Sequence, residues 1–210
     1  MGILPKDQPG ITAVPATPEH WPEIQALFAN IPCWCQYWRV SSREYGRVSK
    51  DQLHEFKLNE RKNALRQQLE KSTPPGVLAY LDDRVVGWCG FGPRFEMERL
   101  ARSRTIPAVD DLPVWSIVCF LVSTGYRRRG VARALLRGAI ECAQAYGAPA
   151  LEAYPVDPGK RRIQSAQAYV GTTSLFEQAG FQRVLETSAR SAGLPRWLMR
   201  LGLPIGSKIF

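Results

Sequence analysis

The stretch of sequence that decides the fold is residues 114–147, VWSIVCFLVSTGYRRRGVARALLRGAIECAQAYG. Its first nine residues, 114–122, are mainly apolar or β-branched, with a length and composition typical of a buried strand. A turn follows at 123–125, and from Val131 onward apolar residues recur at the 3.6-residue spacing of an amphipathic helix. Gly147 and Pro149 then end this helix. The stretch therefore predicts a strand, a tight turn and a helix.

Three arginines and a glycine, Arg127 to Gly130, stand directly before this helix. The first turn of a helix leaves N–H groups without internal partners and carries partial positive charge, so it binds anions such as phosphate. Gly130 and Ala132 leave the backbone there unobstructed. A Walker loop would need Lys-Ser/Thr where Val131-Ala132 stands, and the dinucleotide fingerprint would need a third glycine. A phosphate or pyrophosphate site of another kind is predicted.

The segment Arg127–Ala132 resembles the Gln/Arg-x-x-Gly-x-Gly/Ala signature of the GNAT superfamily of N-acetyltransferases. Residues 122–126 are similar to the strand end and turn that precede this signature in the family. The family's closing pattern, small-x-x-Leu-aromatic-x-x-x-Gly-Phe, is echoed by Thr172, Leu175, Phe176, Gly180 and Phe181. The resemblance covers nearly the whole chain, because the predicted order of strands and helices is also the family's order.

The fold class expected from this order is α/β, of the α+β type: a GNAT fold with a central mixed, mostly antiparallel sheet flanked by helices, in one domain over residues 1–210. Strands are predicted at 11–14, 77–81, 85–91, 114–122, 150–154, 181–186 and 197–203. Helices are predicted at 18–31, 49–71, 131–146 and 172–179. The polar segment 93–113, which contains four arginines, is expected to be a loop over the site or a helical insertion.

Composition limits the partners. The 210 residues include 28 Lys and Arg against 19 Asp and Glu, a net charge of +9 that favours anionic partners. No nucleic-acid-reading motif accompanies this charge, so a solvated basic surface is expected and no nucleic-acid partner. No apolar run approaches the ~20 residues of a membrane span, so no membrane partner is expected. The apolar segment Leu201–Phe210 leaves open whether it packs on a partner subunit in a homodimer or closes the sheet.

The five cysteines indicate reduced thiols in a cytoplasmic protein, since the N-terminal residues lack a signal-peptide core. Cys33 and Cys35 invite a zinc hypothesis. No other cysteine or histidine follows with the spacing of zinc ligands, so no metal is expected. Buried thiols among aromatic residues are the plainer interpretation of this pair.

The resemblance implies acetyl-CoA as cosubstrate. In enzymes of this fold the central strand pairs its backbone with the pantetheine arm, and the turn binds the pyrophosphate. By this resemblance the arm is held by Phe120, Leu121 and Val122. The pyrophosphate is held by Arg127, Arg128, Arg129, Gly130, Val131 and Ala132. An amine of a small molecule or protein then attacks the thioester directly, between the central strand and residues 150–154.

The catalytic residues are less well defined by the sequence. Phe176 stands where the family often has a tyrosine that protonates the departing thiolate, and a phenyl ring donates no proton. Tyr169, just upstream, is our candidate acid, with a packing aromatic as the alternative. Glu152, on the strand beside the acetyl group, is the candidate base, with a surface position equally compatible with its spacing. Glu96 and Glu98 are weaker options.

The acceptor site is expected to lie beside the segment that follows the first helix. Trp34, Tyr37 and Trp38 are candidates for a pocket that takes an apolar, aromatic or cationic group. Arg39 is a candidate partner for an acceptor carboxylate. Two functions compete with acetyl transfer: a non-catalytic acyl-CoA-binding module, favoured by Phe176, and nucleic-acid binding, favoured only by the net charge.

Overall fold

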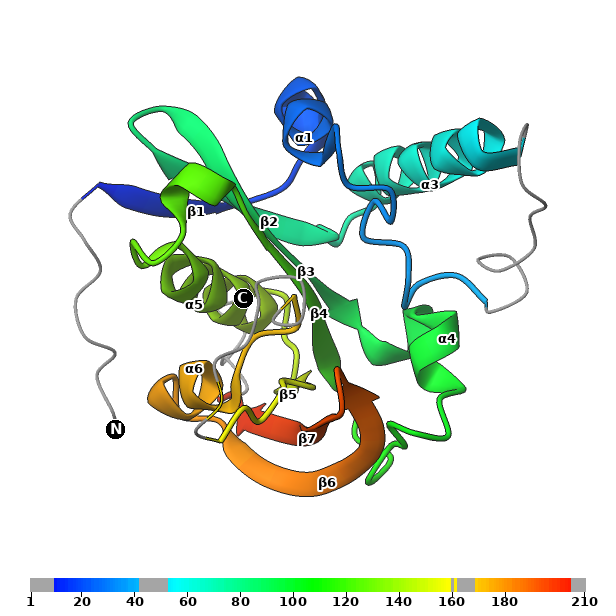
Figure 1. Ribbon diagram of the computed structural model, residues 1–210, viewed down its shortest axis with the longest axis vertical. Helices are drawn as coiled ribbons and strands as arrows, with labels where there is room; N and C mark the ends of the chain where they lie inside the picture. Colours follow the sequence, from blue (N-terminus) through cyan, green and yellow to red (C-terminus); the bar gives the residue numbers. More distant parts are fainter. Residues whose placement is uncertain (1–9, 42–52, 160, 162–168, 205–210) are drawn as a thin grey trace, which may run out of the picture.

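The structure, a computed structural model, describes residues 10–41, 53–159, 161 and 169–204. In this part of the chain one sheet of seven strands runs in the order β1-β2-β3-β4-β5-β7-β6. All neighbouring strands are antiparallel except β4 and β5 (Figure 1). The strands are β1 Ile11–Pro15, β2 Gly76–Leu81, β3 Arg84–Pro93, β4 Trp115–Val122, β5 Ala150–Ala153, β6 Gln182–Ser191 and β7 Leu194–Gly202.

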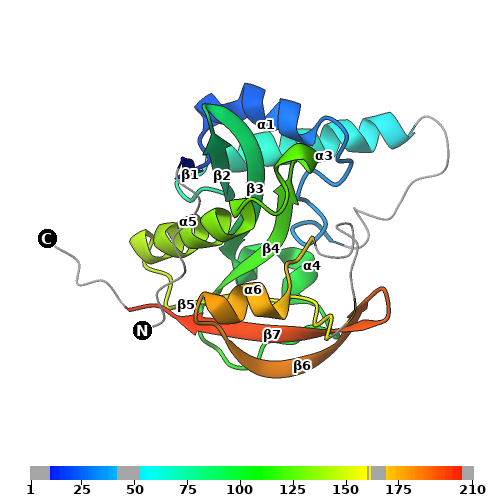
Figure 2. The same ribbon diagram turned by 60° about the vertical axis from the view of Figure 1, so that its left-hand side comes forward.

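Helices cover both faces of the sheet. They are α1 Trp21–Phe28, α3 Leu53–Leu69, α4 Glu98–Ala101, α5 Val131–Ala145 and α6 Thr173–Gln178. Helix α5 crosses one face and contacts β1, β2, β3 and β4, whereas α1 and α3 lie side by side on the opposite face (Figure 2). The predicted mixed sheet flanked by helices is therefore confirmed.

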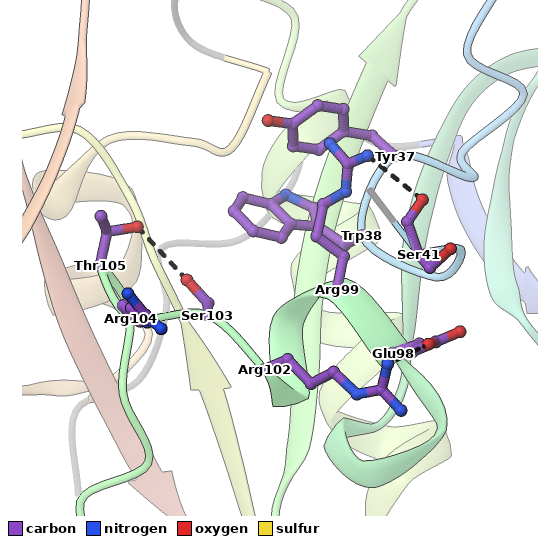
Figure 3. Close-up of a pocket in the computed structure, with 9 residues that line it drawn as sticks. All are labelled: Tyr37, Trp38, Ser41, Glu98, Arg99, Arg102, Ser103, Arg104 and Thr105. Atoms are coloured by element: carbon purple, nitrogen blue, oxygen red, sulfur yellow. Dashed lines mark hydrogen bonds and ion pairs between the residues drawn. The ribbon is translucent and has the colours of Figure 1, made fainter. Parts of the chain in front are cut away.

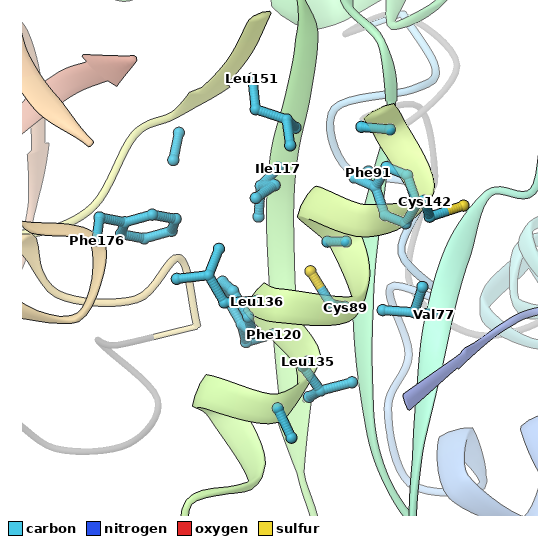
Figure 4. Packing of buried hydrophobic residues seen from close by; sticks show 14 of the residues in the cluster. Val77, Cys89, Phe91, Ile117, Phe120, Leu135, Leu136, Cys142, Leu151 and Phe176 are labelled. Atoms are coloured by element: carbon cyan, nitrogen blue, oxygen red, sulfur yellow. The ribbon is translucent and has the colours of Figure 1, made fainter. Parts of the chain in front are cut away.

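The main core lies between α5 and the sheet. Apolar side chains of α5, such as Leu135 and Leu136, pack there with Ile117 and Phe120 of β4 (Figure 4). Gly138 lets α5 approach β1 closely, because a Cβ at this position would lie 2.6 Å from the Cβ of Ala13. This packing fixes the position of α5, and with it the turn that precedes the helix.

The predicted elements are confirmed within the described residues. Asp82 and Asp83 both have positive φ, 51° and 59°, as a type I′ turn between β2 and β3 requires. The segment 93–113 forms a helical insertion with the short 3₁₀ helix η2, Arg94–Glu96, followed by α4. The start of the helix predicted over 49–71 and the last residues, 205–210, lie outside the described part. None of the described helices has the length and apolar character needed to cross a membrane.

Strands β4 and β5 pair over three residues only and then diverge. Trp115–Ile117 pair with 151–153 in parallel. On its other edge β4 has a β-bulge, because Gly90 pairs with Cys119 and Phe91 with Ile117, which leaves Val118 as the extra residue. Beyond this point the Phe120 N–H donates to the Tyr169 carbonyl at 2.6 Å. Past Ile117 the edge of β4 that faces β5 is therefore released from its pairing with β5.

Candidate active site

The turn before α5 has an unusual backbone. Arg128 and Gly130 have positive φ, 61° and 86°, and Gly130 is the N-cap of the helix. No side chain caps this helix start, and no acidic residue occupies its first turn. N–H groups at such a start need a partner, and the partial positive charge of the helix end favours an anion. The turn therefore has the backbone geometry and charge of an anion site, and phosphate binding there stays a prediction.

A cavity of about 860 Å³ extends from this turn along β4. Its lining includes every predicted cofactor residue except Arg129, whose guanidinium lies 5.7 Å from the centre of the Tyr126 ring. The cavity is lined by Ile31, Cys33, Cys119, Phe120, Leu121, Val122, Arg127, Arg128, Gly130, Val131, Ala132, Arg133, Tyr169, Gly171, Thr172 and Leu175. Three arginines at one place in a mainly apolar lining suit a long ligand with a charged and an apolar part.

Tyr169, the predicted acid, lies in this cavity wall, and burial raises the pKa of its phenol. Phe176, in contrast, is fully buried and packs edge-on against Phe120 and Phe181, with ring centres 6.0 and 5.1 Å apart. The aromatic ring that replaces the family's tyrosine is thus part of the core. Of these two aromatic residues, only Tyr169 both lines the cavity and has a hydroxyl.

Glu152, the predicted base, is 1% exposed and enclosed by ion pairs. Its carboxylate accepts hydrogen bonds from Arg200 at 2.7 Å and from the Tyr154 hydroxyl at 2.9 Å, and Arg94 lies 3.6 Å away. It does not line the cavity described above. The surface position that strand alternation left open for Glu152 is wrong, because β7 and the 93–113 insertion cover this face, and the role of Glu152 as base stays a prediction. The placement argues for a structural role.

The other charged candidates are also held in local contacts. Glu96 pairs with Lys71 at 3.2 Å, and Glu98 with Arg102 at 2.6 Å. Arg39 donates from one Nη to the carbonyls of Pro75 and Phe91, at 2.7 and 2.9 Å. The hypothesis that Arg39 binds an acceptor carboxylate is therefore corrected: the guanidinium links the loop after α1 to β3.

The two cysteines after α1 lie in different surroundings. Cys33 lines the cavity with Cys119, and burial raises its pKa. Cys35 is buried, and a hydrogen bond with Cys119 together with the charge of Arg39 lowers its pKa. Gly90 is required beneath it, since a Cβ there would lie 2.2 Å from the Cys35 sulfur. Cys33 and Cys119 are therefore part of the cavity wall, and Cys35 lies behind this wall in contact with Cys119.

The three aromatic residues predicted for the acceptor site separate in the structure. Trp34 has a positive φ of 46°, is 5% exposed and stacks on Phe28 at 5.4 Å in the core beneath α1. Its assignment to the substrate site was wrong, because the left-handed turn directs the indole back toward the helix. Tyr37 and Trp38, in contrast, line a second cavity of about 480 Å³ (Figure 3).

Arginines complete this second cavity, and the sequence did not assign them to a site. Arg99, Arg102 and Arg104 line it from α4 and the loop that follows. Their only signal in the sequence is their density within the 93–113 segment. Arg196 of β7, buried against Trp38 at 5.6 Å, gave no local signal at all.

Known proteins support the fold and the family. Residues 35–169, well over half of the chain, match the model of the Acetyltransferase (GNAT) family. No curated protein matches the sequence. Among solved structures, an acetyltransferase of the GNAT family from Streptococcus pneumoniae is similar at 18% identity and a TM-score of 0.54, over 92% of this chain and 99% of that one.

Two further structures extend this similarity in fold. YncA of Salmonella typhimurium, whose structure holds its cofactor acetyl-CoA, has 16% identity and a TM-score of 0.55, over 94% of this chain and 96% of its own. The ribosomal-protein-S18-alanine N-acetyltransferase of Escherichia coli has 11% identity and a TM-score of 0.51, over 95% and 98%. With the matched family model and the strand–turn–helix site, the conclusion is that this chain belongs to the GNAT acetyltransferase family.

Proposed function

We propose that this protein transfers an acetyl group from acetyl-CoA to the amine of an acceptor by direct attack on the thioester. The observation that carries this proposal is the single cavity that joins the uncapped start of α5 to the released edge of β4. A diphosphate binds at the helix start, where Arg127 and Arg128 add positive charge. The apolar wall along Phe120 to Val122 accommodates the pantetheine arm.

The chemistry needs a proton donor for the departing thiolate and an acceptor for the proton of the amine. We assign the donor to Tyr169, because this residue lines the cavity and burial raises the pKa of its phenol. Because Glu152 is enclosed by Arg94, Arg200 and Tyr154, water in the cavity takes the proton of the amine in this proposal. The peptide groups beside the Val118 bulge are the candidates for stabilising the oxyanion.

A second candidate is an acyl-CoA-binding module without catalysis. Phe176 favours it, because this residue removes the hydroxyl that the family often places near the leaving sulfur. The two candidates share the cofactor site and differ in turnover. An amine that releases free CoA at a rate above the uncatalysed reaction excludes the module.

Acetyl-CoA binding is the first test. We expect acetyl-CoA at about 100 times its dissociation constant to stabilise the fold by about 2.7 kcal/mol, which a thermal-shift titration detects as a rise in melting temperature. CoA and a longer acyl-CoA, run beside it, report the contribution of the acyl group. Release of free thiol is then followed with a library of amines. No shift with any of the three ligands would contradict the proposed cofactor site.

Replacing Tyr169 with phenylalanine tests the proton donor. We expect kcat to fall about 100-fold or more, in the range typical of general acid catalysis, while acetyl-CoA still binds. Tyr146→Phe is the matched control, because Tyr146 is 47% exposed and lies away from the cavity. A kcat within twofold of the wild type in Tyr169→Phe would remove Tyr169 from the mechanism and leave water as the donor.

A further inference from the structure

The second cavity is strongly basic. It is lined by Tyr37, Trp38, Ser41, Glu98, Arg99, Arg102, Ser103, Arg104 and Thr105 (Figure 3). Three arginines against one glutamate give this lining a net charge of +2. The Glu98 carboxylate already pairs with Arg102 at 2.6 Å. Arg104 has no carboxylate partner in the described part of the chain.

The arginines are presented by a well-anchored frame. The backbone N–H groups of Glu98 and Leu100 donate to the carbonyls of Arg39 and Trp38, each at 3.3 Å, which fastens α4 to the loop after α1. The Arg99 guanidinium lies 4.4 Å from the centre of the Tyr37 ring, a distance typical of a cation–π contact. The Tyr37 ring therefore holds the Arg99 guanidinium at the wall of the cavity.

The cavity borders the place where acyl transfer is proposed. Trp38 and Leu100 belong to the same buried cluster as Val118, the extra residue of the β4 bulge. Cys119, the next residue, lines the cofactor cavity. The segment Val118–Cys119 of β4 thus lies between the two cavities. An acceptor bound in one cavity and an acyl donor bound in the other would meet there.

Arg196 adds a buried positive charge at this junction. It is 4% exposed, its Nε donates to the Tyr154 carbonyl at 2.9 Å, and its Nη2 has no hydrogen-bond partner among the described residues. The phenols of Tyr169, in the first cavity, and Tyr37, in the second, both act electrostatically on it. Burial lowers the pKa of this guanidinium. Arg196 is in the lining of neither cavity, so its charge adds to the positive potential around the second cavity without a direct contact to a ligand there.

From this charge and geometry we infer that the second cavity binds the acceptor through a carboxylate, so that the acceptor is a small amine that also carries a carboxylate, as a free amino acid does. The amine in this statement rests on the proposed function, whereas binding of a carboxylate rests on the cavity alone. A volume of about 480 Å³ is that of a small-molecule site.

The same charges disfavour cationic acceptors. A polyamine would bring several positive charges next to Arg99 and Arg104, with Glu98 already occupied by Arg102. Like charges at close range repel, and opposed charges steer a ligand into a site. Tyr37 and Trp38, which the sequence left open for a cationic group, instead hold arginine guanidinium groups against their faces. The aromatic rings are therefore occupied by the protein's own cations.

The first experiment compares acceptors that differ only in the carboxylate. Thiol release from acetyl-CoA is measured with each of the twenty amino acids, and then with the amide and the decarboxylated amine of the best one. Spermidine represents polycations. We expect kcat/KM for the carboxylate to exceed that of its decarboxylated amine by about 100-fold, since two charge-assisted hydrogen bonds are lost. Equal or better turnover of the decarboxylated amine or of spermidine overturns the inference.

Two variants locate the effect. Arg104→Gln and Arg99→Gln are each expected to lower kcat/KM for the carboxylate about tenfold, through KM, and to leave the decarboxylated amine unchanged. Arg84→Gln is the matched control, because Arg84 is an exposed arginine in the β2–β3 hairpin, outside both cavities. The rise in melting temperature caused by acetyl-CoA should be the same in these three variants and in the wild type. If kcat/KM fell for the decarboxylated amine as well, the arginines would have a structural role and the inference would be overturned.

A binding measurement decides the inference even without turnover. Fluorine NMR with 4-fluorobenzoate and 4-fluorobenzylamine reports binding of an aromatic carboxylate and of the matching cation. We expect only the carboxylate to bind, with its affinity lowered about tenfold in Arg104→Gln and kept in Arg84→Gln. Equal binding of both probes overturns the inference. If carboxylate binding is found but acetyl-CoA gives no shift, the proposed function fails and the anion site stands.

Discussion

We expect Gly130→Glu to weaken acetyl-CoA binding about 100-fold or more, the largest effect of any single substitution on ligand binding in this protein. Gly130 is the N-cap of α5 and borders the cavity, so a glutamate here brings a negative charge to the place proposed for the pyrophosphate. Each charge-assisted hydrogen bond lost costs about 1.5–3 kcal/mol, and two such losses give at least this factor. Isothermal titration calorimetry with acetyl-CoA measures the change directly.

Two controls separate charge from strain in this experiment. Gly130→Ala introduces a side chain at a φ of 86°, where an L-residue is strained by about 1–2 kcal/mol, but adds no charge. Gly125→Glu adds the same charge to the preceding turn, at a position with no atom within 4 Å of a Cβ and outside the lining of the cavity. The pyrophosphate site is supported if Gly125→Glu still binds acetyl-CoA and Gly130→Glu does not. Unchanged affinity in Gly130→Glu would overturn it.

The largest effect on stability is expected from Glu152→Ala. This carboxylate is buried between Arg94 and Arg200 and accepts a hydrogen bond from the Tyr154 hydroxyl. Removing one partner of a buried ion pair typically costs about 3–5 kcal/mol, because the remaining charges stay buried without compensation. We expect the free energy of unfolding, measured by urea denaturation, to fall by this amount.

Glu186→Ala is the comparison for this substitution. Its carboxylate pairs with Arg190 at 3.4 Å with both side chains half exposed, and such a surface pair contributes little. We expect its free energy of unfolding to fall by less than about 0.5 kcal/mol in the same urea experiment. If Glu152→Ala lost no more than Glu186→Ala, the buried network would not be the structural element described above. Glu152 would then have to be reconsidered as a catalytic residue.

The hydrogen bonds of Arg94 also explain why the side chain of Glu152, on β5, is covered by other parts of the chain. Arg94 donates to the Tyr154 hydroxyl at 2.5 Å and to the Ile106 carbonyl at 2.7 Å, so one side chain links η2, the residue after β5 and the loop after α4. Ser116 of β4 completes the set through a 2.7 Å hydrogen bond with the same hydroxyl. The network holds β4 and β5 together at the end where they pair and fixes the point from which they diverge.

The sequence by itself determined the architecture and predicted the residues of the proposed cofactor site. Hydrophobic periodicity and turn residues are local properties, so residues 114–147 predicted β4, the turn and α5. The positive φ of Gly130 is one that glycine adopts without strain. The same locality explains why all but one of the predicted cofactor residues line a single cavity: they are neighbours in the chain.

Only the tertiary structure decided which residues surround the proposed acceptor site. Trp34 and Tyr37 are three residues apart, yet one enters the core and the other a cavity, because the direction of each side chain depends on a left-handed turn. Glu152 is enclosed because β7 places Arg200 opposite it in the sheet register. Arg196 meets Trp38 across 158 positions of the chain. Pairings between distant segments are set by packing and register, and no local pattern in the sequence encodes them.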